Sequence, residues 1–154
     1  MGFGTMRLTG QNAWTPPTDR AMAIAVLKRA KDLGVEVVDT ARYYGPGTTN
    51  AFIREALSPY SSKLFISSKV GVTRNPDQSW QPDARLEQIR ADVETNLLQL
   101  DVEQLHLVQL RLGDGRILPL SGAALLDSLG VIVELKLQGK IRHIGLNNVT
   151  VEQI

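Results

Sequence analysis

Apolar, β-branched runs alternate along this chain with stretches of helical periodicity, and this alternation most constrains its fold. The runs at 35–38, 63–70, 105–111 and 141–146 predict strands, and a short apolar opening at 2–8 predicts a fifth. Each run is nearly continuous in apolar residues, which is typical of parallel strands covered by helices. The order therefore predicts an α/β fold made of βαβ units.

Four segments between these runs have the apolar spacing of amphipathic helices. Thr18 is the expected N-cap of the first helix, Gly34 its expected C′ residue, and Leu33 belongs to its apolar stripe. Residues 71–82, with Pro76, Trp80 and Pro82, are expected to form a long loop. The helices are expected at about 19–33, 50–57, 83–100 and 121–138.

Length and composition indicate one domain over residues 1–154. The chain is 43% hydrophobic and 21% charged, values that fit a single globular core. No repeat, linker or low-complexity stretch divides it. The strand–helix units recur about every thirty to forty residues, a spacing that fits both a doubly wound sheet and a β/α barrel.

Charge and residue types exclude several function classes. Seventeen Lys and Arg against sixteen Asp and Glu leave a net charge of +1, which favours neither nucleic acid nor an anionic membrane. The absence of cysteine excludes disulfides and zinc–cysteine sites and fits a reducing compartment. No signal peptide and no apolar run of roughly 18 residues is present. We therefore expect a cytoplasmic protein.

Three side chains suited to proton transfer follow two neighbouring predicted strands. Asp39 and Tyr44 lie in VVDTARYYG, and Lys69 is near the end of the next strand. Reducing a carbonyl places negative charge on its oxygen, and a tyrosine delivers a proton there best when its pKa, normally about 10, is lowered. Lys69 would lower that pKa, and Asp39 would keep Lys69 charged and oriented. The alternative is a structural Asp39–Lys69 ion pair beside an unrelated tyrosine.

Five segments resemble the aldo-keto reductase family in their order and spacing, and they span essentially the whole chain. They read GFGTMRLTG, VVDTARYYGPGTTN, LFISSKVG, VEQLHLVQLR and GKIRHIGLNNVTVEQ. The resemblance implies the N-terminal half, and slightly more, of an eight-stranded barrel that reduces aldehydes and ketones with NADPH. The expected fold is thus a truncated, partial (β/α) TIM-type barrel of about five parallel strands and four full helices, open rather than closed.

The resemblance also implies a catalytic tetrad, of which Asp39, Tyr44 and Lys69 match three members. The fourth, usually a histidine, falls on Arg111. A guanidinium stays charged, so it binds but does not relay a proton. Arg111 could hold a substrate carboxylate or phosphate or stabilise an oxyanion. The alternative is a strand-end arginine turned to solvent.

The cofactor implied by the resemblance is NADP. Asn148 matches a family position that hydrogen-bonds the nicotinamide carboxamide, and Asn147 stands where that family usually has serine. The alternative is an Asx-type turn that leads into a helix. The family's contacts to the pyrophosphate and 2′-phosphate come from strands and loops after residue 154, so we expect impaired cofactor binding.

The last residues predict the start of a helix. Thr150 and Gln153 form a capping box, and Val149 and Ile154 are spaced as a hydrophobic staple. Five strands cannot close a barrel that uses eight, so both outer strands would carry unpaired backbone groups. We expect a homodimer or another self-association to cover the open barrel.

The remaining tryptophans and histidines have two interpretations each. Trp14 and Trp80 follow predicted strands, so they could wall an apolar substrate pocket or simply pack their loops onto the domain. His106 and His143 lie in predicted strands without cysteines or a carboxylate cluster, so no metal site is expected and structural roles are favoured.

Two function classes follow from these observations. The first is an NADPH-dependent reductase of small-molecule aldehydes and ketones. The second is a shortened, nicotinamide-independent protein that uses Tyr44, Lys69 and Arg111 for dehydration, isomerisation or cyclisation, or to bind a ligand or partner. Cofactor binding discriminates between them.

Overall fold

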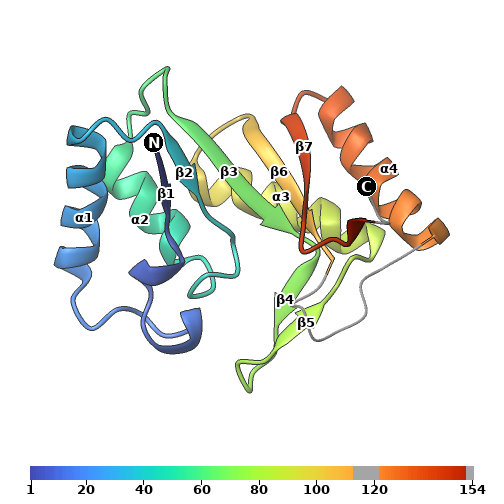
Figure 1. Ribbon diagram of the computed structural model, residues 1–154, viewed down its shortest axis with the longest axis horizontal. Helices are drawn as coiled ribbons and strands as arrows, with labels where there is room; N and C mark the ends of the chain where they lie inside the picture. The colour runs from blue at the N-terminus through green and yellow to red at the C-terminus, as the bar shows by residue number, and fades with distance from the viewer. Residues whose placement is uncertain (113–121, 152–154) are drawn as a thin grey trace.

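The computed structural model of the protein describes residues 1–112 and 122–151 (Figure 1). Its central feature is one five-stranded parallel sheet among these residues, in the order β1-β2-β3-β6-β7. The strand order follows the chain order without the reversal of a doubly wound sheet, so the arrangement is that of a barrel. The strands are β1 (Gly2–Gly4), β2 (Val37–Asp39), β3 (Phe65–Val70), β6 (Leu105–Arg111) and β7 (Ile141–Asn147).

A helix follows each of the first four sheet strands, and the sheet described does not close. Figure 1 shows α1 and α2 beside the β1–β2 side of the sheet and α4 beside β7. The prediction of an open, partial barrel with four helices and five parallel strands is confirmed within the described residues. The helices are α1 (Arg20–Asp32), α2 (Thr48–Leu57), α3 (Leu86–Leu100) and α4 (Gly122–Leu137).

The core lies between the sheet and the helices. Val38, Ile66 and Val108 from the strands and Ile89 from α3 are at most 2% exposed and belong to one apolar cluster. Strand side chains alternate between two faces, so the neighbours of these core residues lie on the other face of the sheet. That face carries Asp39, Lys69, Gln109 and Arg111, which come from the adjacent strands β2, β3 and β6.

The ends of α1 correct two local predictions. Asp19, not Thr18, is the N-cap, since its carboxylate accepts a hydrogen bond from the Met22 N–H at 2.9 Å. Gly34 takes the left-handed conformation expected of a C′ residue, with φ +80°. Leu33 was expected on the buried stripe, but it is 59% exposed because the helix ends before it.

The expected long loop after β3 is wrong in part, because it contains a hairpin. β4 (Val72–Arg74) and β5 (Trp80–Pro82) pair antiparallel. Pro82 argued against a strand, but it terminates a strand of only three residues in a two-stranded sheet, where few backbone donors are needed. The capping box expected of Thr150 and Gln153, and the staple of Val149 with Ile154, stay predictions, since Gln153 and Ile154 lie outside the described residues.

No helix of the described residues is long and apolar enough to cross a membrane. Two short 3-10 turns complete this part of the chain: η1 (Met6–Leu8) and η2 (Gln11–Ala13). Both lie in the connection between β1 and α1, which also carries Trp14. That connection contacts the β4–β5 hairpin, because Arg74 donates to the backbone oxygens of Asn12 and Ala13.

Candidate active site

Asp39 and Lys69 form an ion pair across β2 and β3. Lys69 Nζ contacts Asp39 Oδ1 and also donates to the Thr40 carbonyl at 3.0 Å. The Lys69 side chain is 6% exposed, whereas that of Asp39 is 37% exposed. Lys69 is therefore a nearly buried cation, and its carboxylate partner is partly exposed at the carboxyl end of β2.

Tyr44 joins this pair through a tight turn after β2. The Tyr44 N–H donates to the Ala41 carbonyl at 3.0 Å, and the next residue, Gly45, has φ +59°. A Cβ on Gly45 would meet the side chains of Thr9 and Thr48 at 2.7 and 2.9 Å, so the turn requires glycine. Lys69 Nζ lies 5.1 Å from the Tyr44 ring centroid. The structure thus brings the three predicted groups together.

Arg111 lies in the same region and is not simply turned to solvent. Its Cζ is 5.1 Å from the Trp80 ring centroid. Burial raises the pKa of Tyr43, and the Arg111 cation opposes part of that rise. The Tyr43 ring meets both Tyr44 and Trp80 edge to face, at centroid distances of 5.3 and 5.4 Å. Arg111 and Trp80 therefore form a cationic and aromatic wall beside Tyr43 and Tyr44.

Trp80 and Trp14 are linked through one arginine. The Arg74 guanidinium lies 3.9 Å from the Trp80 ring centroid and 5.3 Å from that of Trp14. Burial lowers the pKa of Arg74, but a guanidinium stays charged at physiological pH. Of the two predicted roles for these tryptophans, loop packing applies to both, and Trp80 also borders the candidate site.

Gln109 is a site residue that the sequence interpretation missed. Its Nε2 donates to Asp39 Oδ2 at 3.1 Å and to Ser67 Oγ at 2.7 Å. Its Oε1 accepts from Asn147 Nδ2 at 3.4 Å, so it connects Asp39 with the end of β7. The available signal was its position two residues before Arg111, which places both on one face of β6.

The two asparagines expected near a nicotinamide close β7. Asn147 is the last strand residue, pairs in register with Arg111, and accepts the Leu112 N–H through its carbonyl at 3.1 Å. Asn148 has φ 57°, a left-handed conformation that asparagine tolerates and that fits the predicted turn. The side-chain amides of Gln109 and Asn147 lie together at this edge of the sheet.

The two histidines make structural contacts away from this site. His106 Nδ1 accepts the Ile66 N–H at 3.2 Å, and its ring lies 5.2 Å from that of Phe65. The His143 ring stacks on the same Phe65 ring, with the two centroids 6.2 Å apart. Within residues 1–112 and 122–151, no group of three or more His, Asp or Glu could hold a metal ion.

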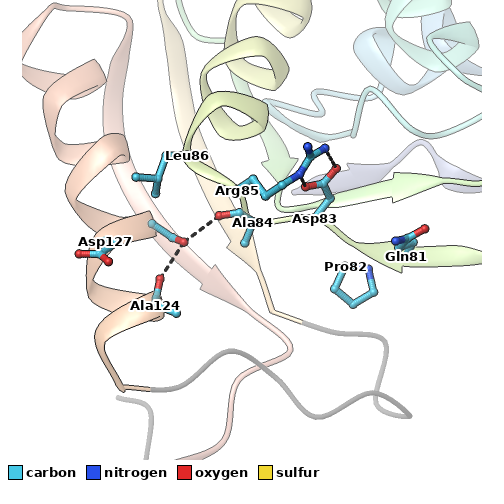
Figure 2. Close-up of a pocket in the computed structure, with 9 residues that line it drawn as sticks. Gln81, Pro82, Asp83, Ala84, Arg85, Leu86, Ala124 and Asp127 are labelled. Atoms are coloured by element: carbon cyan, nitrogen blue, oxygen red, sulfur yellow. Dashed lines mark hydrogen bonds and ion pairs between the residues drawn. The ribbon is translucent and has the colours of Figure 1, made fainter.

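A hollow of about 490 Å³ lies between the β5–α3 connection and α4, and Figure 2 shows its lining. Several of its polar groups already have partners: Arg85 pairs with Asp83, and the Ser128 hydroxyl donates to the Ala84 and Ala124 carbonyls. None of the four predicted catalytic residues lines it. We therefore assign it no role in the chemistry.

Comparison with known proteins identifies the lineage of this site. The model of the Aldo/keto reductase family matches residues 1–154. The chain belongs to the aldo/keto reductase family. Pyridoxine 4-dehydrogenase of Escherichia coli is 44% identical over 156 residues, and an uncharacterized oxidoreductase of Schizosaccharomyces pombe is 38% identical over 154 residues.

Solved structures agree with this membership of the aldo/keto reductases. The glycerol dehydrogenase of Gluconobacter oxydans superposes with a TM-score of 0.81 at 26% identity, over 99% of this chain and 45% of its own. The two curated relatives match all of this chain, which covers 54% and 48% of their lengths. The chain thus spans about half the length of the aldo/keto reductases that it matches.

Proposed function

We propose that this aldo/keto reductase chain carries the proton-donating site of an NADPH-dependent reductase of aldehydes and ketones. The observation that carries the proposal is that Lys69 lies next to both Asp39 and Tyr44. Its Nζ pairs with Asp39 and lies 5.1 Å from the Tyr44 ring centroid. Membership of a family named for this chemistry supports the assignment.

Each residue has a defined role in this proposal. Tyr44 gives its proton to the carbonyl oxygen as negative charge develops there. Lys69 favours the tyrosinate that remains, and Asp39 keeps Lys69 charged and directed at Tyr44. Arg111 supplies a fixed positive charge near the same oxygen, where the family's histidine would donate a neutral hydrogen bond.

The residues present fit the nicotinamide end of the cofactor. The Gln109 and Asn147 side chains place amide donors and acceptors together beside Arg111, as a carboxamide requires. Bound NADPH supplies the hydride for the reduction. Lys69 and Asp39 take no part in the hydride transfer. Lys69 stabilises the tyrosinate form of Tyr44, and Asp39 keeps Lys69 charged.

A fluorescence titration with NADPH tests the proposal. The amides at the β7 end and Arg111 provide polar contacts at the nicotinamide end, so we expect a saturable change in cofactor emission, with the weak affinity that missing phosphate contacts imply. No saturable change at high micromolar cofactor would rule out the reductase for this chain and leave its nicotinamide-independent alternative.

Tyr44→Phe then tests the proton donor in a cofactor-binding protein. We expect turnover of an aldehyde to fall by about 10²–10⁴-fold, the usual contribution of a general acid, while cofactor affinity changes little. Tyr43→Phe is the matched control, because it removes a neighbouring buried phenol but keeps the ring that packs against Tyr44. Equal losses in both variants would reject Tyr44 as the acid.

We also propose that copies of the chain associate across the face of the sheet that carries Asp39 and Lys69, which the helices do not cover. Val37 is 38% exposed and Phe65 is only partly buried on this face. The outer edges of β1 and β7 pair with no other strand of the described residues. Light scattering at micromolar concentration should give at least a dimer mass, and a monomer would refute the association.

A further inference from the structure

Asp92 is a fully buried carboxylate in α3 that the chemistry above does not use. Its side chain is 0% exposed, and it pairs with Arg42, whose side chain is 19% exposed. Gln88 Nε2 donates to the same oxygen, Asp92 Oδ1, at 2.7 Å. The Gly71 N–H also favours its ionised form, so groups from two strand-end loops face this carboxylate.

We propose that Asp92 is a positioning residue that holds the Tyr44 turn and the Lys69 strand end in register. The assignment rests on the proposed function for its catalytic consequence. Its structural basis is that Arg42 precedes Tyr44 by two residues and Gly71 follows Lys69 by two. One side chain on α3 thereby pairs with the side chain of the turn before Tyr44 and lies beside the corner that follows Lys69.

The first connection fixes the turn that carries Tyr44. The Arg42 carbonyl accepts the Gly47 N–H at 2.7 Å, while the Tyr44 N–H bonds to the Ala41 carbonyl. The Arg42 backbone is therefore part of the turn, and its side chain connects the turn to Asp92 of α3. Movement of the Arg42 side chain would move the backbone on both sides of Tyr44.

The second connection fixes the corner after Lys69. Gly71 has φ +92°, and a Cβ there would lie 2.7 Å from the Arg111 carbonyl oxygen. Its own carbonyl accepts the Asp83 N–H at 2.9 Å. The corner that faces Asp92 is therefore packed directly against the backbone of Arg111, the fourth candidate residue.

Stability alone does not account for this arrangement. Burial raises the pKa of Asp92, although Arg42, Gln88 and Gly71 each lower it. A buried ion pair often contributes no more to stability than apolar residues of the same volume. A directional charge pair differs from an apolar contact in fixing where the guanidinium lies, which is what a positioning role requires.

Tyrosine NMR tests the proposal without depending on activity. The chain has three tyrosines, so ¹³C-tyrosine labelling reports Tyr43, Tyr44 and Tyr60 separately. Tyr60 donates to the Leu100 carbonyl at the far end of α3 and serves as an internal reference. In folded Asp92→Asn protein we expect the Tyr43 and Tyr44 signals to shift or broaden and the Tyr60 signal to stay unchanged.

Kinetics give the second readout if the wild-type chain binds NADPH and turns over. Asp92→Asn should lower kcat by about ten- to a hundredfold, the loss expected from small misplacement, with less effect on KM and cofactor affinity. Arg42→Lys, which keeps the charge, should recover part of the loss that Arg42→Met causes. Absence of NADPH binding in the wild type would refute the reductase and leave the NMR test intact.

Glu94→Gln is the matched control, because it makes the same carboxylate-to-amide change on α3. Glu94 pairs with Lys140 at an exposed position, so its loss should leave all three tyrosine signals in place. If Asp92→Asn does not fold, Gln88→Met removes one donor to the same carboxylate and should give a smaller shift of Tyr44. Unchanged Tyr43 and Tyr44 signals in a folded Asp92 or Gln88 variant would overturn the positioning role.

Discussion

Asn96 gives the sharpest stability prediction, because it joins α3 to both catalytic strand ends. Its Oδ1 accepts from Asn50 Nδ2 at 3.0 Å and from the Ser68 hydroxyl at 2.6 Å. Its Nδ2 donates to the Asp92 carbonyl at 2.8 Å. Asn50 in turn accepts from the Thr40 hydroxyl at 2.8 Å, and Thr40 and Ser68 are neighbours of Asp39 and Lys69.

Asn96→Ala removes three hydrogen bonds at a position that is 0% exposed. Each contributes about 1 kcal/mol, and an unsatisfied buried group costs about 1–3 kcal/mol. The Ser68 hydroxyl loses the acceptor that it uses, whereas Asn50 keeps a bond to Gln99 at 2.9 Å. We therefore expect a loss of about 3–4 kcal/mol, a large part of the about 5–15 kcal/mol typical of a domain.

Urea unfolding followed by circular dichroism measures this loss directly. A change of about 3 kcal/mol should lower the melting temperature by about 6–12 °C in a chain of this size. Asn75→Ala is the control, because Asn75 bonds to Ser79 in an exposed turn and should change stability by less than about 0.5 kcal/mol. A loss below about 1 kcal/mol for Asn96→Ala would refute the interpretation that this network supports the strand ends.

Three further predictions concern Gly71, His106 and Tyr60. Gly71→Ala should destabilise the protein by about 2–3 kcal/mol, since the new Cβ combines a positive φ with a clash against the Arg111 backbone. Gly34 also has a positive φ but open space around it, so Gly34→Ala should cost only about 1 kcal/mol. Equal urea midpoints for the two variants would contradict this. Burial, Arg142 and His143 lower the pKa of His106, so the unfolded chain takes up a proton first and stability should decrease as pH falls below about 6.5. His106→Gln should flatten that decrease in urea titrations at successive pH values, and an unchanged slope would exclude His106 as its source. Burial raises the pKa of Tyr60 to about 12, so stability should decrease as pH rises above about 10, where the unfolded chain loses this proton first. Absorbance titration of Tyr60→Phe should lack the phenolate transition near pH 12, whereas Tyr43, whose pKa burial raises further, should still titrate above it. Persistence of the transition near pH 12 would assign it to another tyrosine.

Much of the fold follows from local patterns in the sequence. The apolar spacing over residues 83–100 predicted α3, whose Ile89, Val93 and Leu97 are buried in the core. Gly34 and Gly139 both have positive φ where α1 and α4 end, because their lack of a Cβ permits it. The hairpin of β4 and β5 was not predicted, since three-residue strands next to proline carry too little periodicity to be detected.

The position of the candidate site could also be predicted, but not its connections. Asp39, Tyr44 and Lys69 were expected together because parallel strands end at one edge, and Lys69 does contact both Asp39 and the Tyr44 region. Gln109 was missed because a single polar residue between Val108 and Leu110 looks like ordinary alternation. Its bond to Asp39 joins residues 70 positions apart, which no local pattern encodes.

The sequence by itself determined which segments become strands and helices and which polar residues stand at the strand ends. These properties depend on periodicity and on residue type, which act over a few neighbouring positions. Only the tertiary structure decided that Arg111 lies beside Trp80, that Gln109 binds Asp39, and that Asp92 faces Arg42. Those contacts depend on side-chain directions set by packing distant elements together, because a polar group buried by that packing must find whichever partner the fold brings within reach.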